Sequence, residues 1–286
     1  VASLKSKKDS SIVRALELVR EEEADAMLSC GNTGSLMAGG TIKLRTLEGI
    51  DRPALGTIWP GSQRYFVLLD AGANPESKPI HIVHNAVLGL NYARIVLGIN
   101  QPKLGLLSIG TEESKGNELI QESHHLLKQT RSLLNYQGLI EGFQMFENEV
   151  DVVVCDGFVG NIVLKLCEGL VTNLFGRIRD AVRAGWLTTL MSPLFARSLR
   201  RLHSDLDWQS VGGAPLLGLQ GIALVGHGQT SPTAIANAIT KARSYATSGL
   251  LEALESALQE SSPNEQVNTS ELPMSQTGEE EREQHS

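Results

Sequence analysis

The sequence has few aromatic residues and few cysteines. Phe, Trp and Tyr make up 5% of its 286 residues, whereas glycine occurs 28 times. Many tight turns and little aromatic core favour an α/β fold over a β-sandwich. There are three cysteines without a CxxC pair, and such an odd, sparse set is typical of a reducing cytoplasm. We therefore expect a cytoplasmic α/β protein.

Long hydrophobic runs and an excess of positive charge are also missing. No stretch of about 18 apolar residues occurs, and no apolar segment follows the polar, basic residues 1–8, so we expect neither a membrane-spanning helix nor a signal peptide. The net charge is −7, and 259–286 holds seven glutamates against one arginine. The nearly neutral remainder gives no sign of nucleic-acid binding. The composition predicts one domain over 1–258 and a disordered acidic tail over 259–286.

Five short apolar runs are each followed by a polar, glycine-containing loop and a helical pattern. The runs span 26–28, 65–69, 104–109, 150–155 and 222–225. Helices are expected from 35, over 79–97, over 117–134, from 161 and over 231–258. This alternation predicts a three-layer α/β/α fold with a mostly parallel sheet. Because ligands bind at the carboxyl ends of such strands, we expect the five loops to share one active-site edge.

The first loop, 29–34, consists of small residues in front of a helix. A helix N-terminus offers free N–H groups and the positive end of the helix dipole. Asn32, Thr33 and Gly34 could therefore cradle a phosphate group. Ordinary capping of the helix by Thr33 or Ser35 explains the same pattern equally well.

The loops at 70–74 and 110–116 carry charged residues. Asp70 could orient a base or hold a metal, but an Asx-type turn is the simpler explanation. Lys115 could hold an anion, although the spacing does not fit a P-loop and a solvated lysine is the simpler explanation. Neither loop alone therefore indicates an activity.

The loop at 155–161 leads into a helix that we expect to begin at Asn161. Lys165 lies one turn later on the same face, so the two side chains could contact one ligand. A helix cap followed by a surface lysine is the alternative. Cys155 and Cys30 could accept an acyl group, but cysteines that end buried strands are usually inert.

Histidines offer one candidate site. His227 lies between two glycines at the end of the last run, where it could donate a hydrogen bond to a carbonyl oxygen or act as a base; a turn histidine explains it equally well. His81 and His84 lie one turn apart but lack a third ligand nearby, so we expect no metal site.

Apolar residues recur with helical spacing over 186–202 and are flanked by arginines. The pattern fits an interfacial membrane segment or a docking face for an acidic partner. A core-facing helical hairpin with a dimer contact is the alternative. The residues concerned are Trp186, Leu190, Leu194, Phe195, Arg197, Arg200 and Arg201.

Taken together, the loops resemble those of the bacterial phosphate acyltransferases of phospholipid synthesis. The matching stretches run in family order over 29–34, 52–55, 69–74, 110–116, 155–161, 213–218 and 226–228. The resemblance implies a fold related to isocitrate and isopropylmalate dehydrogenases and to phosphotransacetylase. It also implies a homodimer that touches the membrane peripherally through a helical hairpin at about 175–205, and no metal or organic cofactor.

The resemblance further implies a reaction in which acyl carrier protein donates its acyl group to inorganic phosphate. Phosphate needs positioning and charge compensation, and the thioester oxygen needs hydrogen-bond donors. As catalytic residues we expect His227, Asn161 and Lys165. As substrate-binding residues we expect Ser29, Asn32, Thr33, Gly34, Asp70, Asn74, Thr111, Lys115 and Asp156. The arginines near the hairpin could dock the acidic carrier protein or anionic lipid, and a glycerol-3-phosphate acyltransferase is a further expected partner.

One family feature has no counterpart here. The family begins with a strand and an Asp-x-Met-Gly-Gly-Asp loop, so we expect this chain to lack the family's N-terminal segment. Three alternatives stay open: a phosphotransacetylase that uses acyl-CoA, an inactive truncated scaffold, and a nicotinamide-dependent dehydrogenase of the related fold. The last is disfavoured because the sequence contains no GxGxxG.

Overall fold

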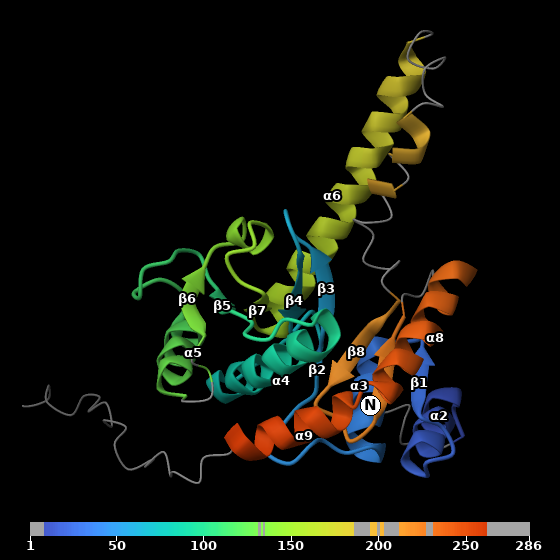
Figure 1. The fold of residues 1–286 in the computed structure, drawn as a ribbon, viewed down its shortest axis with the longest axis vertical. Coiled ribbons are helices and arrows are strands. Elements are labelled where there is room, and N and C mark those ends of the chain that lie inside the picture. Colours follow the sequence, from blue (N-terminus) through green and yellow to red (C-terminus); the bar gives the residue numbers. More distant parts are fainter. Residues whose placement is uncertain are drawn as a thin grey trace, which may run out of the picture.

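The strands form two sheets (Figure 1). The computed structural model describes residues 9–130, 133, 135–185, 195–198, 201–202, 212–226 and 231–261. The first sheet has the order β1-β9-β8-β2, and the second has the order β3-β4-β7-β5-β6. The strands are β1 (Ala26–Ser29), β2 (Ala54–Leu55), β3 (Thr57–Pro60), β4 (Tyr65–Leu69), β5 (Leu104–Leu107), β6 (Tyr136–Ile140), β7 (Val152–Val154), β8 (Ala214–Leu217) and β9 (Ile222–Val225).

Parallel pairing predominates among the described strands. In the second sheet β4, β7, β5 and β6 are parallel neighbours, and the edge strand β3 is antiparallel to β4. In the first sheet β1 is parallel to β9, whereas β8 is antiparallel to β9 and to β2. The predicted α/β class with mostly parallel strands is confirmed. The strands are divided between two sheets, however, and are not gathered in one.

Helices follow the strands much as the sequence predicts. They are α2 (Ser11–Arg20), α3 (Thr33–Lys43), α4 (Pro79–Leu97), α5 (Glu118–Gln129), the 3₁₀ turn η2 (Gln144–Phe146), α6 (Gly157–Ala184), α8 (Pro232–Thr247) and α9 (Leu250–Ser261). The helix predicted over 231–258 is in fact two helices, because Gly249 adopts a φ of 69° between them. Helix α9 continues past the predicted domain boundary at 258, and the rest of the predicted tail lies outside the described residues.

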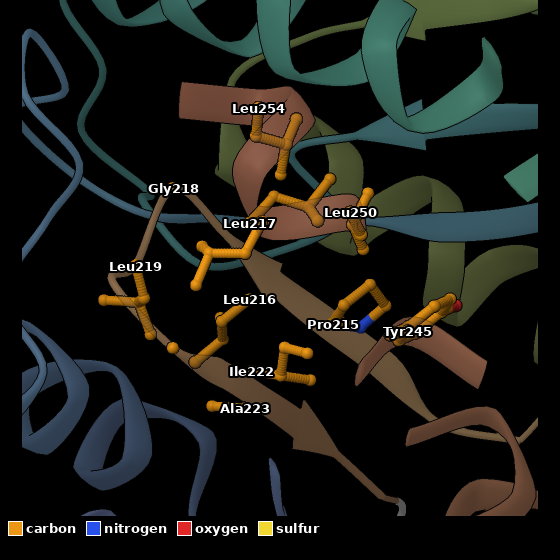
Figure 2. Close-up of a pocket in the computed structure, with 12 residues that line it drawn as sticks. Pro215, Leu216, Leu217, Gly218, Leu219, Ile222, Ala223, Tyr245, Leu250 and Leu254 are labelled. Carbon is orange, nitrogen blue, oxygen red and sulfur yellow. The ribbon is translucent and has the colours of Figure 1, made fainter. Parts of the chain in front are cut away.

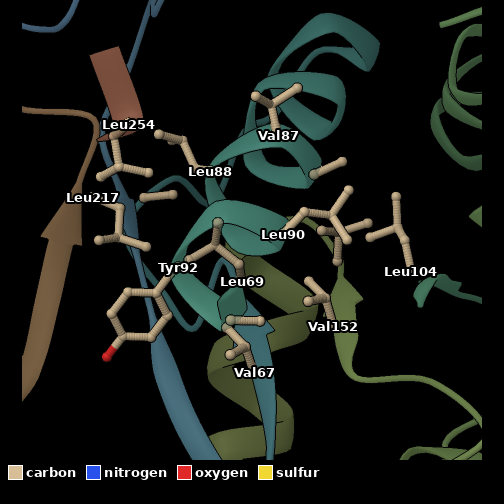
Figure 3. Packing of buried hydrophobic residues seen from close by; sticks show 14 of the residues in the cluster. Val67, Leu69, Val87, Leu88, Leu90, Tyr92, Leu104, Val152, Leu217 and Leu254 are labelled. Carbon is tan, nitrogen blue, oxygen red and sulfur yellow. The ribbon is translucent and has the colours of Figure 1, made fainter. Parts of the chain in front are cut away.

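Helix α4 connects the two sheets through the core. Leu88 and Tyr92 of this helix have no exposed surface. Figure 3 shows them in one apolar cluster with Leu69 of β4, Leu217 of β8 and Leu254 of α9. Since these strands belong to different sheets, the two sheets share one continuous core around α4.

Helix α6 projects away from both sheets (Figure 1). Its first turns are buried at Gly157, Gly160 and Leu164, and the rest of the helix is largely exposed. Contrary to expectation, this helix is by length and composition apolar enough to cross a membrane, and only 11% of its most apolar stretch is buried. Its buried start anchors it to the second sheet. Residues 195–198 and 201–202 are also helical, whereas Trp186, Leu190, Leu194 and Arg200 lie outside the described residues.

Candidate active site

The five predicted loops occupy two sheet edges instead of one. The loops after β4, β5 and β7 leave the same edge of the second sheet, because these strands are parallel neighbours. The segments after β1 and β9 leave the first sheet together, and the N–H of Gly226 donates to the carbonyl oxygen of Ser29 at 2.9 Å. Within the described part of the chain, no hydrogen bond or ion pair joins the two groups of loops.

The carboxylate of Asp70 organises the loop after β4. Asp70 is fully buried, and its Oδ1 accepts hydrogen bonds from the N–H groups of Leu55, Gly72 and Ala73 at 3.1, 3.0 and 2.7 Å. Its Oδ2 accepts from the backbone and side-chain nitrogens of Asn74 at 2.7 and 2.9 Å. Burial raises the pKa of Asp70, and the backbone N–H groups act in the opposite direction.

These hydrogen bonds give the Asp70 carboxylate a structural role and not a role in binding substrate. Both of its oxygens are occupied, so a substrate could reach it only by displacing backbone donors. The side chain of Asn74 is also buried and donates to the carbonyl oxygen of Pro53 at 2.7 Å. The two residues predicted to bind substrate here instead close the 70–74 loop and tie it to β2 of the first sheet.

Helix α6 begins directly against this loop. Asp156 caps the helix, since its Oδ1 accepts from the N–H groups of Phe158 and Val159 at 2.9 and 3.0 Å. The helix therefore begins at Gly157 and not at Asn161, as predicted. A Cβ atom added at Gly160 would overlap the carbonyl oxygen of Asp70. The close approach of helix and loop thus requires glycine at this position.

The cysteine at the strand end before α6 is buried and unreactive. Cys155 is fully buried, and its thiol lies 3.7 Å from the carbonyl oxygen of Asp70. Burial raises the pKa of Cys155, so the reactive thiolate is disfavoured. The geometry is that of an inert core cysteine, which was the favoured interpretation of the sequence.

Asn161 stands at the edge where loop and helix meet. Its side chain is exposed, and its carboxamide makes no hydrogen bond with any described residue. A Cβ atom at Gly72 would lie 3.2 Å from Asn161 Oδ1, so the carboxamide lies directly beside the 70–74 loop. Lys165, one turn further, forms an ion pair with Glu168 at 2.8 Å. Asn161 is therefore the freer of the two to meet a ligand.

The loop after β5 presents an exposed cation. Lys115 is exposed and has no ion-pair partner among the residues that the structure describes. Its aliphatic stem packs near Gly110, where an added Cβ would lie 2.8 Å from Lys115 Cγ. Thr111 is also exposed. Sequence reasoning overlooked Ser108 at the start of this loop, whose hydroxyl is buried without a described partner.

The edge of the first sheet carries the second set of predicted residues. Asn32 caps α3, because its Oδ1 accepts from the N–H of Ser35 at 2.9 Å. The cap is therefore neither Thr33 nor Ser35. Ser29 Oγ accepts from the N–H of Gly31 at 3.2 Å. His227 follows Gly226 in the sequence but lies outside the described residues, so its role stays a prediction.

A pocket lies at the turn that joins β8 to β9 (Figure 2). Its lining is apolar and includes Leu216, Leu219, Ile222, Leu250 and Leu254. No charged residue lines it in the part of the chain that the structure describes. Because the turn precedes β9, the pocket lies at the opposite end of that strand from Gly226, and it belongs to neither loop edge.

Known proteins match the chain over most of its length. A family model described as fatty acid synthesis protein matches residues 1–253. A phosphate acyltransferase of Geotalea uraniireducens is 44% identical over 261 residues, which cover 91% of this chain and 75% of that protein. A phosphate acyltransferase of Desulfitobacterium hafniense is 45% identical over 257 residues, covering 90% and 76% of the two chains.

Solved structures share the fold at low sequence identity. EutD phosphotransacetylase from Staphylococcus aureus superimposes with a TM-score of 0.53 at 17% identity, over 82% of this chain and 67% of the other. A branched-chain phosphotransacylase from Enterococcus faecalis gives 0.52 at 13% identity, over 83% and 79%. These structures support the predicted α/β fold, and the sequence relatives confirm the resemblance drawn from the loops. The chain therefore belongs to the phosphate acyltransferase family of fatty acid synthesis proteins and is an acyltransferase.

Proposed function

We propose that the chain transfers an acyl group from the thioester of acyl carrier protein to inorganic phosphate, giving acyl phosphate for phospholipid synthesis. One observation carries the assignment of the site. The ammonium of Lys115 and the carboxamide of Asn161, which have no partner among the described residues, follow the adjacent parallel strands β5 and β7 and leave the same edge of the second sheet. A cation for an anion and a neutral donor for a carbonyl oxygen are the two groups that this reaction needs.

The proposed chemistry is a single acyl transfer. A phosphate oxygen attacks the thioester carbonyl, the carbonyl oxygen becomes an oxyanion, and the C–S bond breaks as the new C–O bond is retained. The thiolate of the carrier protein takes up a proton from water. Phosphate is already anionic at neutral pH, so positioning and charge compensation matter more than a strong base. The reaction calls on no metal or organic cofactor.

We assign the following roles to the candidate residues. Lys115 holds the phosphate, and Asn161 donates to the developing oxyanion, with Thr111 and Lys165 nearby. Asp70, Asn74 and Asp156 hold the loops in place. At the edge of the first sheet, the N-terminus of α3, with Ser29, Thr33 and Gly34, offers N–H groups to a second anionic group. His227, which lies outside the described residues, is proposed as a further donor to the carbonyl oxygen.

Lys115→Ala is expected to raise the KM for phosphate about tenfold, with a smaller effect on kcat, because a cation that binds the ground-state anion contributes roughly 1.4 kcal/mol. Lys115→Arg should retain most of the affinity. Acyl phosphate is measured as the hydroxamate after trapping with hydroxylamine. Lys103→Ala is the matched control, since Lys103 is exposed at the other end of β5.

The same assay tests the donor. Wild-type protein is expected to use acyl carrier protein thioesters better than the corresponding CoA thioesters. Turnover of CoA thioesters alone would assign the chain to the phosphotransacetylase type. An unchanged phosphate KM in Lys115→Ala would remove Lys115 from the site.

We further propose that α6 mediates homodimer formation. Beyond Phe158, which lies on the same face in the first turn, four largely exposed apolar side chains recur every fourth residue along this helix, namely Ile162, Leu166, Leu170 and Leu174 at 49, 68, 64 and 48%. This spacing places them on one face, and a row of exposed apolar side chains favours association. Exposed arginines lie further along the chain and could bind acidic carrier protein or anionic lipid at the cytoplasmic membrane surface. They are Arg177, Arg179, Arg183, Arg197 and Arg201, and Phe195 near them is also exposed.

A Leu166→Glu/Leu170→Glu variant is expected to weaken the dimer at least tenfold, because it places charges in an apolar contact. Light scattering at micromolar concentration measures the mass, and Thr172→Glu, an exposed polar position on the same helix, is the control. Sedimentation with anionic vesicles at low and high salt measures membrane contact separately. A monomeric wild-type protein would contradict the dimer, and vesicle binding lost in the leucine variant alone would assign the stripe to the membrane.

A further inference from the structure

Two large apolar side chains stand in solvent at the edge that carries Lys115 and Asn161. The side chain of Ile109 is 80% exposed and that of Phe158 is 60% exposed. Ile109 follows β5, and Phe158 lies in the first turn of α6, just after β7. Single exposed apolar residues are common on protein surfaces, so their meaning depends on their neighbours.

The pairing of the strands brings the two residues to the same place. β5 and β7 are parallel, with Leu106 opposite Val154, and neighbouring strands lie about 4.8 Å apart. Ile109 and Phe158 follow these paired residues closely along the two adjacent chain segments. Both therefore lie just beyond the carboxyl edge of the second sheet, the edge that also carries Lys115 and Asn161.

Each apolar side chain has a polar neighbour of the proposed site. Ile109 directly precedes Gly110, against which the Lys115 stem packs. Phe158 lies on the same helix as Asn161, less than one turn before it. The edge thus combines a cation and an amide with two uncovered apolar groups. A fatty acyl donor has the same division, with a polar reacting end that continues into a hydrocarbon chain.

We propose that Ile109 and Phe158 contact the hydrocarbon chain of the acyl donor beyond its first few carbons and so favour long chains over short ones. This inference rests on the acyl-transfer function proposed above and adds the residues that discriminate between acyl chains of different length. Apolar contact contributes in proportion to the area removed from water. A chain of a few carbons ends before it covers these side chains, whereas a long chain covers both.

The test compares chain lengths in the same protein. Ile109→Ser and Phe158→Ser are assayed with butyryl and palmitoyl thioesters of acyl carrier protein at saturating phosphate. In each variant, kcat/KM for the palmitoyl donor is expected to fall roughly fivefold, which corresponds to about 1 kcal/mol. The value for the butyryl donor should stay within about twofold of wild type. Ile109→Leu, which keeps the apolar area, should retain the preference.

Ile42→Ser is the matched control, because Ile42 is 58% exposed near the end of α3, away from the loop edges. Equal losses for both donors would indicate a general structural effect and overturn the inference, as would no loss for either donor. A change in molecular mass in place of a change in donor preference would assign the residues to a subunit contact and also overturn it. A wild-type protein that forms no acyl phosphate from any donor would instead contradict the proposed function.

Discussion

Asn161→Ala is expected to lower kcat for acyl phosphate formation roughly 100-fold while leaving the phosphate KM nearly unchanged. Removal of one preorganised donor to a developing oxyanion commonly reduces kcat by about two to three orders of magnitude. The Asn161 carboxamide is exposed, has no described partner and is held beside Gly72 of the 70–74 loop. It is therefore free to donate to substrate, and its loss should affect the transition state more than the ground state.

Several variants separate this role from a structural one. Asn161→Asp removes the donor and adds a negative charge, so it should be at least as inactive as the alanine variant. Asn173→Ala, which changes an exposed asparagine further out on the same helix, should keep wild-type kcat. Because Asn161 is exposed, the midpoint of thermal unfolding should hardly move. An alanine variant with kcat within about threefold of wild type would exclude Asn161 as an oxyanion donor.

Gly160→Ala is expected to reduce the free energy of unfolding by about 3 kcal/mol, the upper part of the usual range for overpacking. The added Cβ would overlap the carbonyl oxygen of Asp70 and lie 2.9 Å from its carbonyl carbon. Asp70 cannot retreat, because its carboxylate is bound to Leu55 of the first sheet and to the N–H groups of its own loop. Helix α6 must move instead, which should displace Asn161 and lower activity as well.

The matched control lies on the same helix. A Cβ at Gly169 would meet nothing within 4 Å, so Gly169→Ala should raise the free energy of unfolding by about 0.5–1 kcal/mol through helix propensity. Urea denaturation of both variants measures the difference. Equal stabilities of the two variants would show that the start of α6 is not packed against the 70–74 loop.

Elements with strong local signals were predictable from the sequence. Tyr65–Leu69 and the helix from Pro79 to about Leu97 were predicted correctly, because a continuous apolar run defines β4 and a proline marks the first turn of α4. β3 and β6 were missed, and so were β2 and β8: β2 has two residues, and β8 contains Pro215, which is unusual inside a strand. Their pairing with each other depends on residues far apart in the chain.

The division into two sheets left no local signal. A strand–loop–helix alternation looks the same whether the strands join one sheet or two, since partners are chosen by long-range contacts. Helix caps were similarly ambiguous. Several polar residues lie around the start of α3, and both Asp156 and Asn161 lie near the start of α6, so only the backbone geometry selects Asn32 and Asp156 as the caps. For Asp70, an Asx-type turn was the simpler interpretation, but its bond to Leu55 required the tertiary fold.

The order of strands along the chain has a consequence for how the protein is made. β1 and β2 precede the whole second sheet, and their partners β9 and β8 follow it. During translation the second sheet can therefore assemble first. β1 and β2 remain without their partners until nearly the whole domain has left the ribosome. Such non-local pairing slows folding and exposes unpaired edges to aggregation. The first sheet is thus completed only when β8 and β9 have been synthesised. The segment around Gly56 links β2, which until then has no partner, to β3 of the second sheet, which can already be folded.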